Sequence, residues 1–312
     1  MSLRRVLITG AAGLVGQNLT LKLKEDPNIE IIGIDKHKAN IKVFRDLHPD
    51  VKIIEQDLSN EGEWFDAFAN IDILVINHAQ IGATTKKPFI DNNIVATENV
   101  LKAAHQANIP YIVHISSSVV NSMANDFYTE TKKEQERLVL ESGIPSIVLR
   151  PTLMFGWFDR KHLGWLRNFM LKAPVFPIPG NGKYLRQPLY VSDFCEIILS
   201  SIKDKRPGQI YNISGHQEID YIDLIREVKL AANAKIPIIK IPYSLFWFLL
   251  KAYSLIDKNP PFTSKQLAAL VTPDKFEVID WPTIFNVHST QLDKALNQTF
   301  QNPVYSKVSL EF

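Results

Sequence analysis

A tyrosine and a lysine stand four residues apart in the segment Tyr128-Thr129-Glu130-Thr131-Lys132. If this segment is helical, both side chains point the same way, because residues four apart share one face of a helix. A phenol can exchange a proton with a substrate hydroxyl or carbonyl, and a nearby ammonium favours the phenolate form. Of the nine tyrosines, only Tyr128 has a lysine at this offset. The pair therefore predicts acid–base chemistry on an alcohol or a ketone.

Three consecutive serines, Ser116, Ser117 and Ser118, follow a β-branched apolar run and precede the tyrosine. Open α/β sheets bind their ligands beyond the carboxyl ends of the strands, so a hydroxyl placed there can bond the reacting oxygen. The other serines of the run would cap the local backbone.

A glycine-rich turn begins at Gly10, directly after the strand-like Val6–Thr9, and opens a helix-like segment. Gly10 permits a tight turn, Gly13 lets backbone N–H groups approach a pyrophosphate, and Gly16 lets the helix pack close to the strand. The helix N-terminus adds partial positive charge for the phosphates. The order of strand, glycine turn and helix predicts a dinucleotide site, with these contacts: Gly10, Ala12, Gly13, Leu14, Val15 and Gly16.

Asp35 ends the second predicted strand, about twenty residues beyond the glycines, where a carboxylate bonds the adenosine ribose hydroxyls. It would repel a 2′-phosphate by about 4 kcal/mol gross at roughly 4 Å and an effective dielectric near 20. The sequence therefore favours NAD over NADP. Lys36, His37 and Lys38 follow at once and either soften this preference or form a solvated loop.

Together these motifs resemble the extended short-chain dehydrogenase/reductases, the NAD-dependent epimerase/dehydratase family, whose members largely act on nucleotide sugars. The resemblance covers residues 5–215 well and the remainder loosely. Secondary patterns agree with it at these segments: Asp57-Leu58, Asn77-His78-Ala79, the helix from Asn93 to Val100, Leu149-Arg150-Pro151, Gly180-Asn181-Gly182 with Arg186, and Val191-Ser192-Asp193.

The resemblance implies roles for individual residues. Ser118, Tyr128 and Lys132 would be catalytic, with Ser118 preferred to Ser117 because the family's catalytic serine is the last of its run. Gln80, Ser118 and Arg186 would bind substrate, with Arg186 gripping a nucleotide diphosphate. Lys132 would also hold the nicotinamide ribose. No metal is expected, and the further cofactor contacts would be Asp35, Lys36, Asp57, Leu58, Asn77, His78, Ala79, Asn93, Ser116, Tyr128, Lys132 and Pro151.

Two departures from the family pattern narrow the chemistry. The loop from Ser118 to Tyr128 is shorter than is usual in the family, which removes part of the usual substrate cover and leaves Ser117 as an alternative to Ser118. Dehydratase members place Thr-Asp-Glu after this strand, whereas Ser118-Val119-Val120 carries no acid, so sugar 4,6-dehydration is not expected. The absence of a cysteine near the site likewise disfavours 3,5-epimerase/reductase chemistry.

Alternating apolar and amphipathic segments predict the elements that position these residues: an α/β Rossmann fold with a doubly wound parallel sheet. After Arg150 prolines become frequent and the alternation ends. We predict an NAD-binding domain over 1–150, to which 190–215 returns, and a smaller α/β substrate domain over most of 151–312, with a poorly anchored tail after Asn302. The expected strands are Val6–Thr9, Glu30–Asp35, Val51–Gln56, Ile73–Ile76, Tyr111–Ser116, Ser146–Arg150 and Gln209–Ser214; the expected helices are Leu14–Lys24, Ile41–Leu47, Glu61–Phe68, Asn93–Gln106 and Phe127–Glu141.

Composition limits the class of protein. Hydrophobic residues make up 46% and charged residues 22%, as in ordinary folded proteins, and a net charge of +2 gives no reason to expect nucleic acid as a partner. Cys195 is alone and is expected to be a small apolar residue on a helix. Because structure is predicted from Val6 onward, we expect no signal peptide and a cytoplasmic protein.

The apolar segment 241–256 is too short for a membrane span. We expect it to pack on the substrate-domain core or on a dimer partner, with shallow membrane contact as the alternative.

The leading hypothesis is an NAD-dependent nucleotide-sugar 4-epimerase or keto-reductase. A hydroxysteroid-like or other lipid alcohol dehydrogenase is the second hypothesis, since Phe246-Trp247-Phe248 could line an apolar pocket. The third is a non-catalytic dinucleotide-binding protein, like the atypical relatives associated with respiratory complex I. By resemblance we also expect a homodimer formed through Asn93–Gln106 and Phe127–Glu141.

Overall fold

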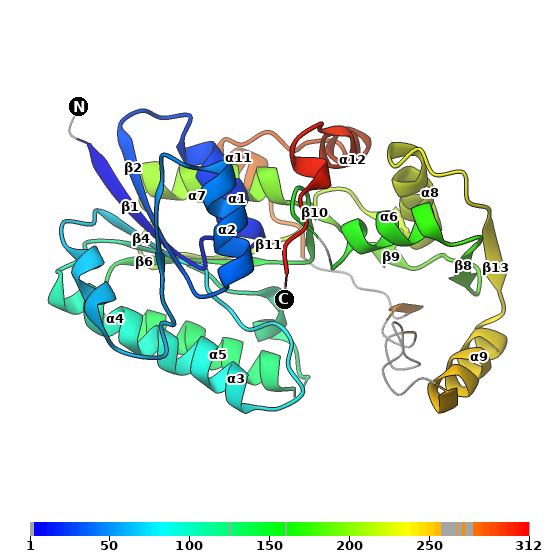
Figure 1. The fold of residues 1–312 in the computed structure, drawn as a ribbon, viewed down its shortest axis with the longest axis horizontal. Helices are drawn as coiled ribbons and strands as arrows, with labels where there is room; N and C mark the ends of the chain where they lie inside the picture. Colours follow the sequence, from blue (N-terminus) through cyan, green and yellow to red (C-terminus); the bar gives the residue numbers. More distant parts are fainter. Residues whose placement is uncertain are drawn as a thin grey trace.

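Seven parallel strands form the central sheet of the computed structural model, in the order β11-β6-β5-β4-β1-β2-β3 (Figure 1). The structure describes residues 3–124, 126–159, 161–256, 267, 270–271 and 277–311. The strand order changes direction between β1 and β4, and ligands of open α/β sheets bind at such a point. The strands are β1 (Arg4–Thr9), β2 (Ile29–Asp35), β3 (Lys52–Glu55), β4 (Ile73–Ile76), β5 (Ile112–Ile115), β6 (Ser146–Pro151) and β11 (Ile210–Ile213).

Helices cover both faces of this sheet, which is why its inner strands are apolar on both sides. One face carries α1 (Leu14–Leu23), α2 (Lys38–Leu47), α7 (Val191–Asp204) and α11 (Trp281–Phe285). The other carries the 3₁₀ helix η1 (Glu63–Phe68), α4 (Ala96–Gln106) and α5 (Phe127–Glu141). The short α3 (Lys87–Phe89) and the π-helical η2 (Ile90–Val95) lead into α4.

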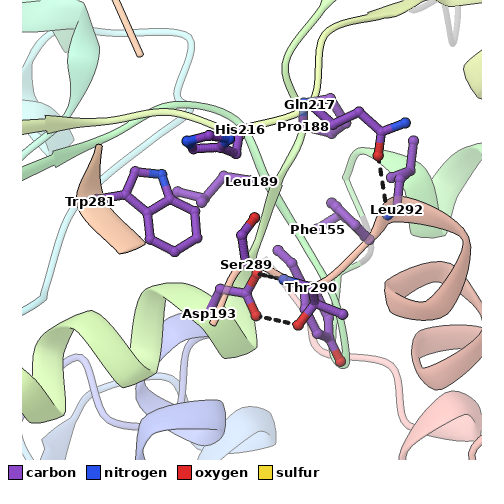
Figure 2. A pocket seen from close by; sticks show the side chains of 12 residues that line it. Phe155, Pro188, Leu189, Asp193, His216, Gln217, Trp281, Ser289, Thr290 and Leu292 are labelled. Carbon is purple, nitrogen blue, oxygen red and sulfur yellow. Dashed lines mark hydrogen bonds between the residues drawn. The ribbon is translucent and has the colours of Figure 1, made fainter. Parts of the chain in front are cut away.

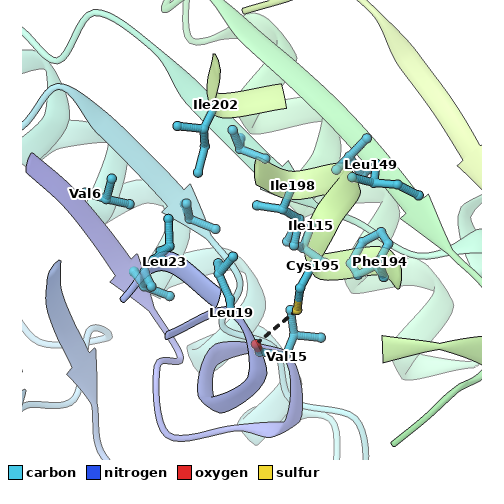
Figure 3. Close-up of a cluster of buried hydrophobic side chains, with 14 of the residues drawn as sticks. Val6, Val15, Leu19, Leu23, Ile115, Leu149, Phe194, Cys195, Ile198 and Ile202 are labelled. Carbon is cyan, nitrogen blue, oxygen red and sulfur yellow. Dashed lines mark hydrogen bonds between the residues drawn. The ribbon is translucent and has the colours of Figure 1, made fainter. Parts of the chain in front are cut away.

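The helix pair α1 and α7 shows how the segment after β6 returns to the sheet. Cys195 of α7 is fully buried, with its Sγ 3.9 Å from the Val15 carbonyl oxygen of α1 (Figure 3). Burial raises the pKa of its thiol far above the usual range. The prediction that Cys195 is a small apolar residue on a helix is confirmed.

A second group of elements packs around its own apolar core. It lies beside the carboxyl ends of the large sheet in Figure 1. Its pairs of short strands are β7 with β10, β9 with β12, and β8 with β13. Its elements are β7 (Met154–Phe155), α6 (Leu163–Lys172), β8 (Phe176–Pro179), β9 (Leu185–Arg186), β10 (Leu189–Tyr190), β12 (Ile219–Asp220), α8 (Tyr221–Ala231), β13 (Ile238–Ile241), α9 (Tyr243–Ile256) and α12 (Leu292–Gln301); η3 (Ser118–Asn121) and η4 (Tyr305–Lys307) are single 3₁₀ turns.

The Rossmann fold predicted from the sequence is confirmed, and each of the seven expected strands is present within two residues of its predicted bounds. Three helices differ. The helix predicted from Ile41 begins at Lys38, and the one predicted from Glu61 is a 3₁₀ helix that begins at Glu63. The segment predicted to start at Asn93 is helical from Lys87, and Asn93 lies in the π-helical turn. Such turns are found most often at functional sites.

The tail after Asn302 is anchored, so the prediction of a loose tail is wrong. The Asn40 side chain of α2 donates to the Glu311 carbonyl at 3.0 Å and accepts from the Glu311 N–H at 2.7 Å. Leu310 beside it is buried. Local sequence patterns could not predict these two hydrogen bonds, because they join residues near opposite ends of the chain.

The apolar segment 241–256 forms α9, which does not pack into the core that we expected. Leu245, Phe248 and Leu249 are each about half exposed. Within the described part of the chain, no helix is both long and apolar enough to cross a bilayer.

His114 gives a prediction about acid stability. It lies in β5 with no exposed surface, and burial lowers its pKa well below the usual value. Because the folded state takes up its proton at lower pH than the unfolded chain, stability is present above about pH 6.5 and is lost as the pH falls. We expect His114→Leu to flatten this acid dependence by about 1.4 kcal/mol per pH unit. Urea unfolding from pH 7 to 4.5 measures the slope; parallel curves for both proteins in that range would contradict the prediction.

Candidate active site

The turn between β1 and α1 is built for close approach by a phosphate. Gly10 has φ +67°, and a Cβ there would lie 2.9 Å from the His78 Cα. A Cβ on Gly16 would lie 2.4 Å from the Ala11 carbonyl oxygen, so α1 packs directly on the turn. No side chain caps α1 at Gly13. The first-turn N–H groups are therefore left to an anion, which fits the pyrophosphate of a dinucleotide.

Asp35 lies beside this turn at the end of β2. Its Oδ2 accepts from the Ala12 N–H at 3.0 Å, and its Oδ1 accepts from the His37 N–H at 2.9 Å. Burial raises the pKa of Asp35 above its usual value in spite of these donors. The carboxyl group is thus fixed at the point where an adenosine ribose would meet it.

A cleft of about 120 Å³ opens next to Asp35. Lys36 crosses its wall: its Nζ lies 3.0 Å from Asp57 Oδ2 and 2.5 Å from Asn92 Oδ1. The Lys36 ammonium is therefore paired with an acid, which weakens its capacity to attract a 2′-phosphate. The lining residues are Gly10, Asp35, Lys36, Gln56, Asp57, Leu58, His78, Ala79, Gln80, Asn92 and Ala96.

Asn77 and His78 hold the glycine turn from behind. Asn77 donates to the Gly10 carbonyl at 3.0 Å, and His78 Nδ1 lies 2.8 Å from the Thr9 hydroxyl. The other ring nitrogen lies 3.1 Å from the Thr97 hydroxyl. Burial lowers the pKa of His78 to about 3, so the ring is neutral at pH 7 and does not act as an acid there.

Asn93 and Gln80 take positions that differ from those implied by the resemblance. Asn93 is fully buried; it accepts from the Gln80 N–H at 2.6 Å and donates to the Thr131 hydroxyl at 3.0 Å. It therefore positions the loop after β4 against α5. Gln80, expected at the substrate, lines the cleft beside Asp35.

Tyr128 meets a serine at the end of β5. The Ser117 hydroxyl acts to lower the pKa of Tyr128, but burial of the phenol has the larger effect and raises that pKa above its usual value. Ser117 is buried, whereas Ser118 begins η3. The geometry therefore favours Ser117 over Ser118, the serine that the resemblance had suggested. The reason is that β5 ends at Ile115, one residue before the end that we predicted at Ser116.

Lys132 lies one turn further along α5, with only 1% of its surface exposed. Its Nζ donates to the Ile115 carbonyl at 3.1 Å and to Gln135 Oε1 at 2.5 Å. Burial lowers the pKa of Lys132 to about 7. Burial also raises the pKa of Tyr128, so the phenol is protonated at neutral pH; that Lys132 favours the phenolate stays a prediction.

Two further residues of this site, Gln135 and Glu136, were missed by the sequence analysis. Gln135 joins Lys132 to the Thr97 hydroxyl at 2.9 Å and to the His78 carbonyl at 3.2 Å. Glu136 is buried and accepts from Ser116 at 2.5 Å and from Arg150 Nε at 3.0 Å. The hydroxyl of Ser116, which we expected at the cofactor, donates to the Glu136 carboxylate. Gln135 and Glu136 follow Lys132 at a spacing of three and four residues, so they share its buried face of α5. This helical spacing of polar residues is the signal by which the sequence could have identified them.

The other end of the site involves β6 and the second group of elements. Pro151 ends β6 opposite Ile213 of β11. Arg186 of β9 is partly buried; its guanidinium donates to the Leu185 carbonyl at 2.6 Å and to the Leu270 carbonyl, and it lies 6.0 Å from the Tyr221 ring. Arg186 is therefore held by the backbone carbonyls of two segments and does not lie on a free surface.

Asp193, from the same motif as Arg186, is structural. It accepts from the Thr290 N–H at 2.8 Å and from the Thr290 hydroxyl at 2.6 Å, as Figure 2 shows. The cavity beside it measures about 20 Å³, room for a single water molecule. It is therefore not a ligand site.

The fold and this site define the class as a Rossmann oxidoreductase-type protein with a dinucleotide turn and a Ser-Tyr-Lys constellation. The model of the NAD dependent epimerase/dehydratase family matches residues 6–214. The chain belongs to that family, as the resemblance indicated, and the family's cofactor is NAD, as Asp35 predicted.

Individual relatives span much of both chains. The chain is 25% identical over 255 residues to dTDP-D-glucose 4,6-dehydratase from Homo sapiens, covering 72% of this chain and 73% of the relative. It is 26% identical over 272 residues to 3-beta-hydroxysteroid dehydrogenase from Mycolicibacterium neoaurum, covering 77% and 73%. A solved UDP-glucuronic acid 4-epimerase from Bacillus cereus, in complex with UDP-glucuronic acid and NAD, aligns with a TM-score of 0.74 at 19% identity, covering 95% and 98%.

Asp35 supplies a test of the cofactor site. We expect Asp35→Asn to weaken NAD binding about tenfold, through loss of a charge-assisted hydrogen bond, and to strengthen NADP binding, through loss of repulsion. Asparagine can still accept from the Ala12 N–H, so the turn should survive. Equilibrium dialysis with each dinucleotide measures both effects, and Asp66→Asn, exposed on η1, is the matched control. An unchanged ratio of the two affinities would refute this role for Asp35.

Proposed function

We propose that this protein is an NAD-dependent enzyme that transfers a hydride at a hydroxyl-bearing carbon of a nucleotide sugar. As a 4-epimerase it would remove the hydride and return it to that carbon, and as a keto-reductase it would add a hydride to the corresponding ketone. The observation that carries the proposal is the hydroxyl pair of Tyr128 and Ser117 at the end of β5, one turn from the buried Lys132. This pair stands beside the switch point of the sheet, where the glycine turn also opens. Membership of the family and the nucleotide-sugar relatives support the substrate class.

The roles of the residues follow from their contacts. Tyr128 would take the proton of a sugar hydroxyl, while Ser117 orients the same oxygen. The chemistry that NAD supplies when bound is the acceptance and return of a hydride. Lys132 would hold the nicotinamide ribose and, once it is drawn to a ligand, favour the phenolate of Tyr128. In an epimerase the transient ketone would rotate in the site before reduction on its other face. Dehydration is not proposed, because Ser118, Val119 and Val120 carry no carboxyl group.

The remaining site residues divide between cofactor and substrate. The glycine turn, Asp35, Asp57 with Leu58, and Ala79 with Gln80 would contact NAD along the cleft. Arg186 would meet the diphosphate of the substrate, and Pro151 would lie against the nicotinamide. A homodimer through α4 and α5 and a cytoplasmic location complete the proposal.

A lipid alcohol is the second candidate substrate. Two apolar side chains close to Ser117 and Tyr128 in sequence are exposed, Met123 at 97% and Phe127 at 41%, and Leu153, two residues after β6, is 45% exposed. An apolar substrate would cover them, and one curated relative is named for a steroid. A purely structural or sensing role fits less well, because Tyr128, Ser117 and Lys132 are all present in bonded positions.

Substitutions of the hydroxyl pair test the reaction. We expect Tyr128→Phe to lower kcat about 10²- to 10⁴-fold, because the proton acceptor is lost. We expect Ser117→Ala to lower it about 10- to 100-fold and to cost more than Ser118→Ala, its matched neighbour. The thermal melting temperature of each variant should stay close to that of the parent, which checks the fold. Full activity in Tyr128→Phe would disprove the assigned role, and a larger loss in Ser118→Ala would return the serine role to Ser118.

Arg186 separates the two substrate classes. If the substrate carries a diphosphate, Arg186→Met should raise KM about 10- to 100-fold with a smaller effect on kcat, because one charge-assisted bond is lost in the ground state. Steady-state kinetics with nucleotide sugars and with hydroxysteroids measures this. An unchanged KM for a turned-over steroid would favour the lipid candidate.

A further inference from the structure

The helix α9 has apolar side chains that no core covers. In Figure 1 it extends beyond β13, apart from the helices that flank the large sheet. Phe248 is 62% exposed, Leu245 and Leu249 are each 49% exposed, and Trp247 is 41% exposed. Burial of such side chains is normally what stabilises a helix in water, so a contiguous exposed set indicates an interaction surface.

The exposed residues cover more of the helix than one stripe, while Phe246 and Leu250, which share one side, are partly buried. At 100° per residue, Leu245 and Leu249 lie on one side, while Trp247 lies nearly opposite to them and Phe248 lies between. Tyr243 and Tyr253 are also exposed and fill further sectors. A partner helix or a protein groove covers one face only, typically a stripe of about 100°. The exposed set of α9 is wider than such a stripe, and a helix that lies in the headgroup region of a bilayer can bury a wider set in the fluid lipid.

The length and charge of the segment point to a lipid surface. The 14-residue helix is about 21 Å long, short of the roughly 30 Å of a bilayer core, so it can lie in the interface but not span. Residues 228–256 contain no Asp or Glu and carry four lysines: Lys229, Lys235, Lys240 and Lys251. Tyrosine and tryptophan favour the headgroup level, and lysines near it attract anionic lipids.

We propose that α9 docks this protein onto the surface of an anionic bilayer. Trp247, Phe248 and Leu249 would insert below the headgroups. Lys251, 5.5 Å above the Trp247 ring, would extend to the lipid phosphates along with Lys240. The docking does not depend on the proposed activity, since no substrate or cofactor takes part in it.

Sedimentation with vesicles tests this docking on the full chain. We expect binding to vesicles of phosphatidylcholine mixed with phosphatidylglycerol, and much weaker binding to phosphatidylcholine alone. Trp247→Ser with Phe248→Ser should weaken binding about tenfold or more. Lys240→Glu with Lys251→Glu should weaken it about 10- to 100-fold and abolish its salt dependence. Leu230→Ser, which removes a 68% exposed leucine from α8, should bind as the parent does.

Three results would overturn the proposal: no sedimentation with anionic vesicles, equal binding to neutral vesicles, or full binding by the Trp247→Ser/Phe248→Ser variant. Light scattering without lipid distinguishes the rival occupant. A dimer that this variant converts to monomer, with no vesicle binding by the parent, would assign α9 to a second copy of the chain. Thermal melts of each variant confirm that it is folded, and because the altered side chains are exposed we expect little change in Tm.

Discussion

A single buried ammonium constrains the whole site. Lys132 is removed from water between α5 and the end of β5, and desolvation lowers its pKa to about 7. Burying a charge is costly unless hydrogen bonds accompany it, and here the Ile115 carbonyl and Gln135 supply them. Because these partners belong to β5 and to α5 itself, the bonds fix the rotation and depth of the helix. Tyr128, one turn earlier, is positioned by the same constraint.

The network behind Lys132 joins the two halves of the chemistry. Gln135 reaches the Thr97 hydroxyl, Thr97 reaches His78, and His78 reaches Thr9 at the end of β1. The catalytic helix and the glycine turn are thus linked by one chain of buried hydrogen bonds through α4 and β4. A neutral His78 suits this position, since a second positive charge beside Lys132 would be repelled. These hydrogen bonds hold α5 and the glycine turn in one arrangement, which is how a preorganised active site lowers its reorganisation cost.

Local patterns in the sequence were sufficient for the fold and for part of the site. The glycine turn, Asp35 and the Tyr128–Lys132 pair are defined by spacing within one or two elements, and β-branched runs define the strands. What could not be predicted depends on contacts between distant segments. The choice of Ser117 depends on where β5 ends, the role of Asn93 on a π-helical turn, and the anchoring of the tail on Asn40 and Glu311. For α9, apolarity was evident, but whether a core would cover it is a property of the tertiary structure.

The most direct test of the account is calorimetric titration with NAD, repeated in the presence of UDP-, GDP- and dTDP-sugars. A dinucleotide turn beside a Ser-Tyr-Lys constellation predicts NAD binding that one class of nucleotide sugar strengthens, because cofactor and substrate share the space above Tyr128. NAD binding indifferent to every sugar would contradict the nucleotide-sugar assignment and favour a lipid substrate. No binding of NAD at all would contradict the central claim that this site holds a dinucleotide.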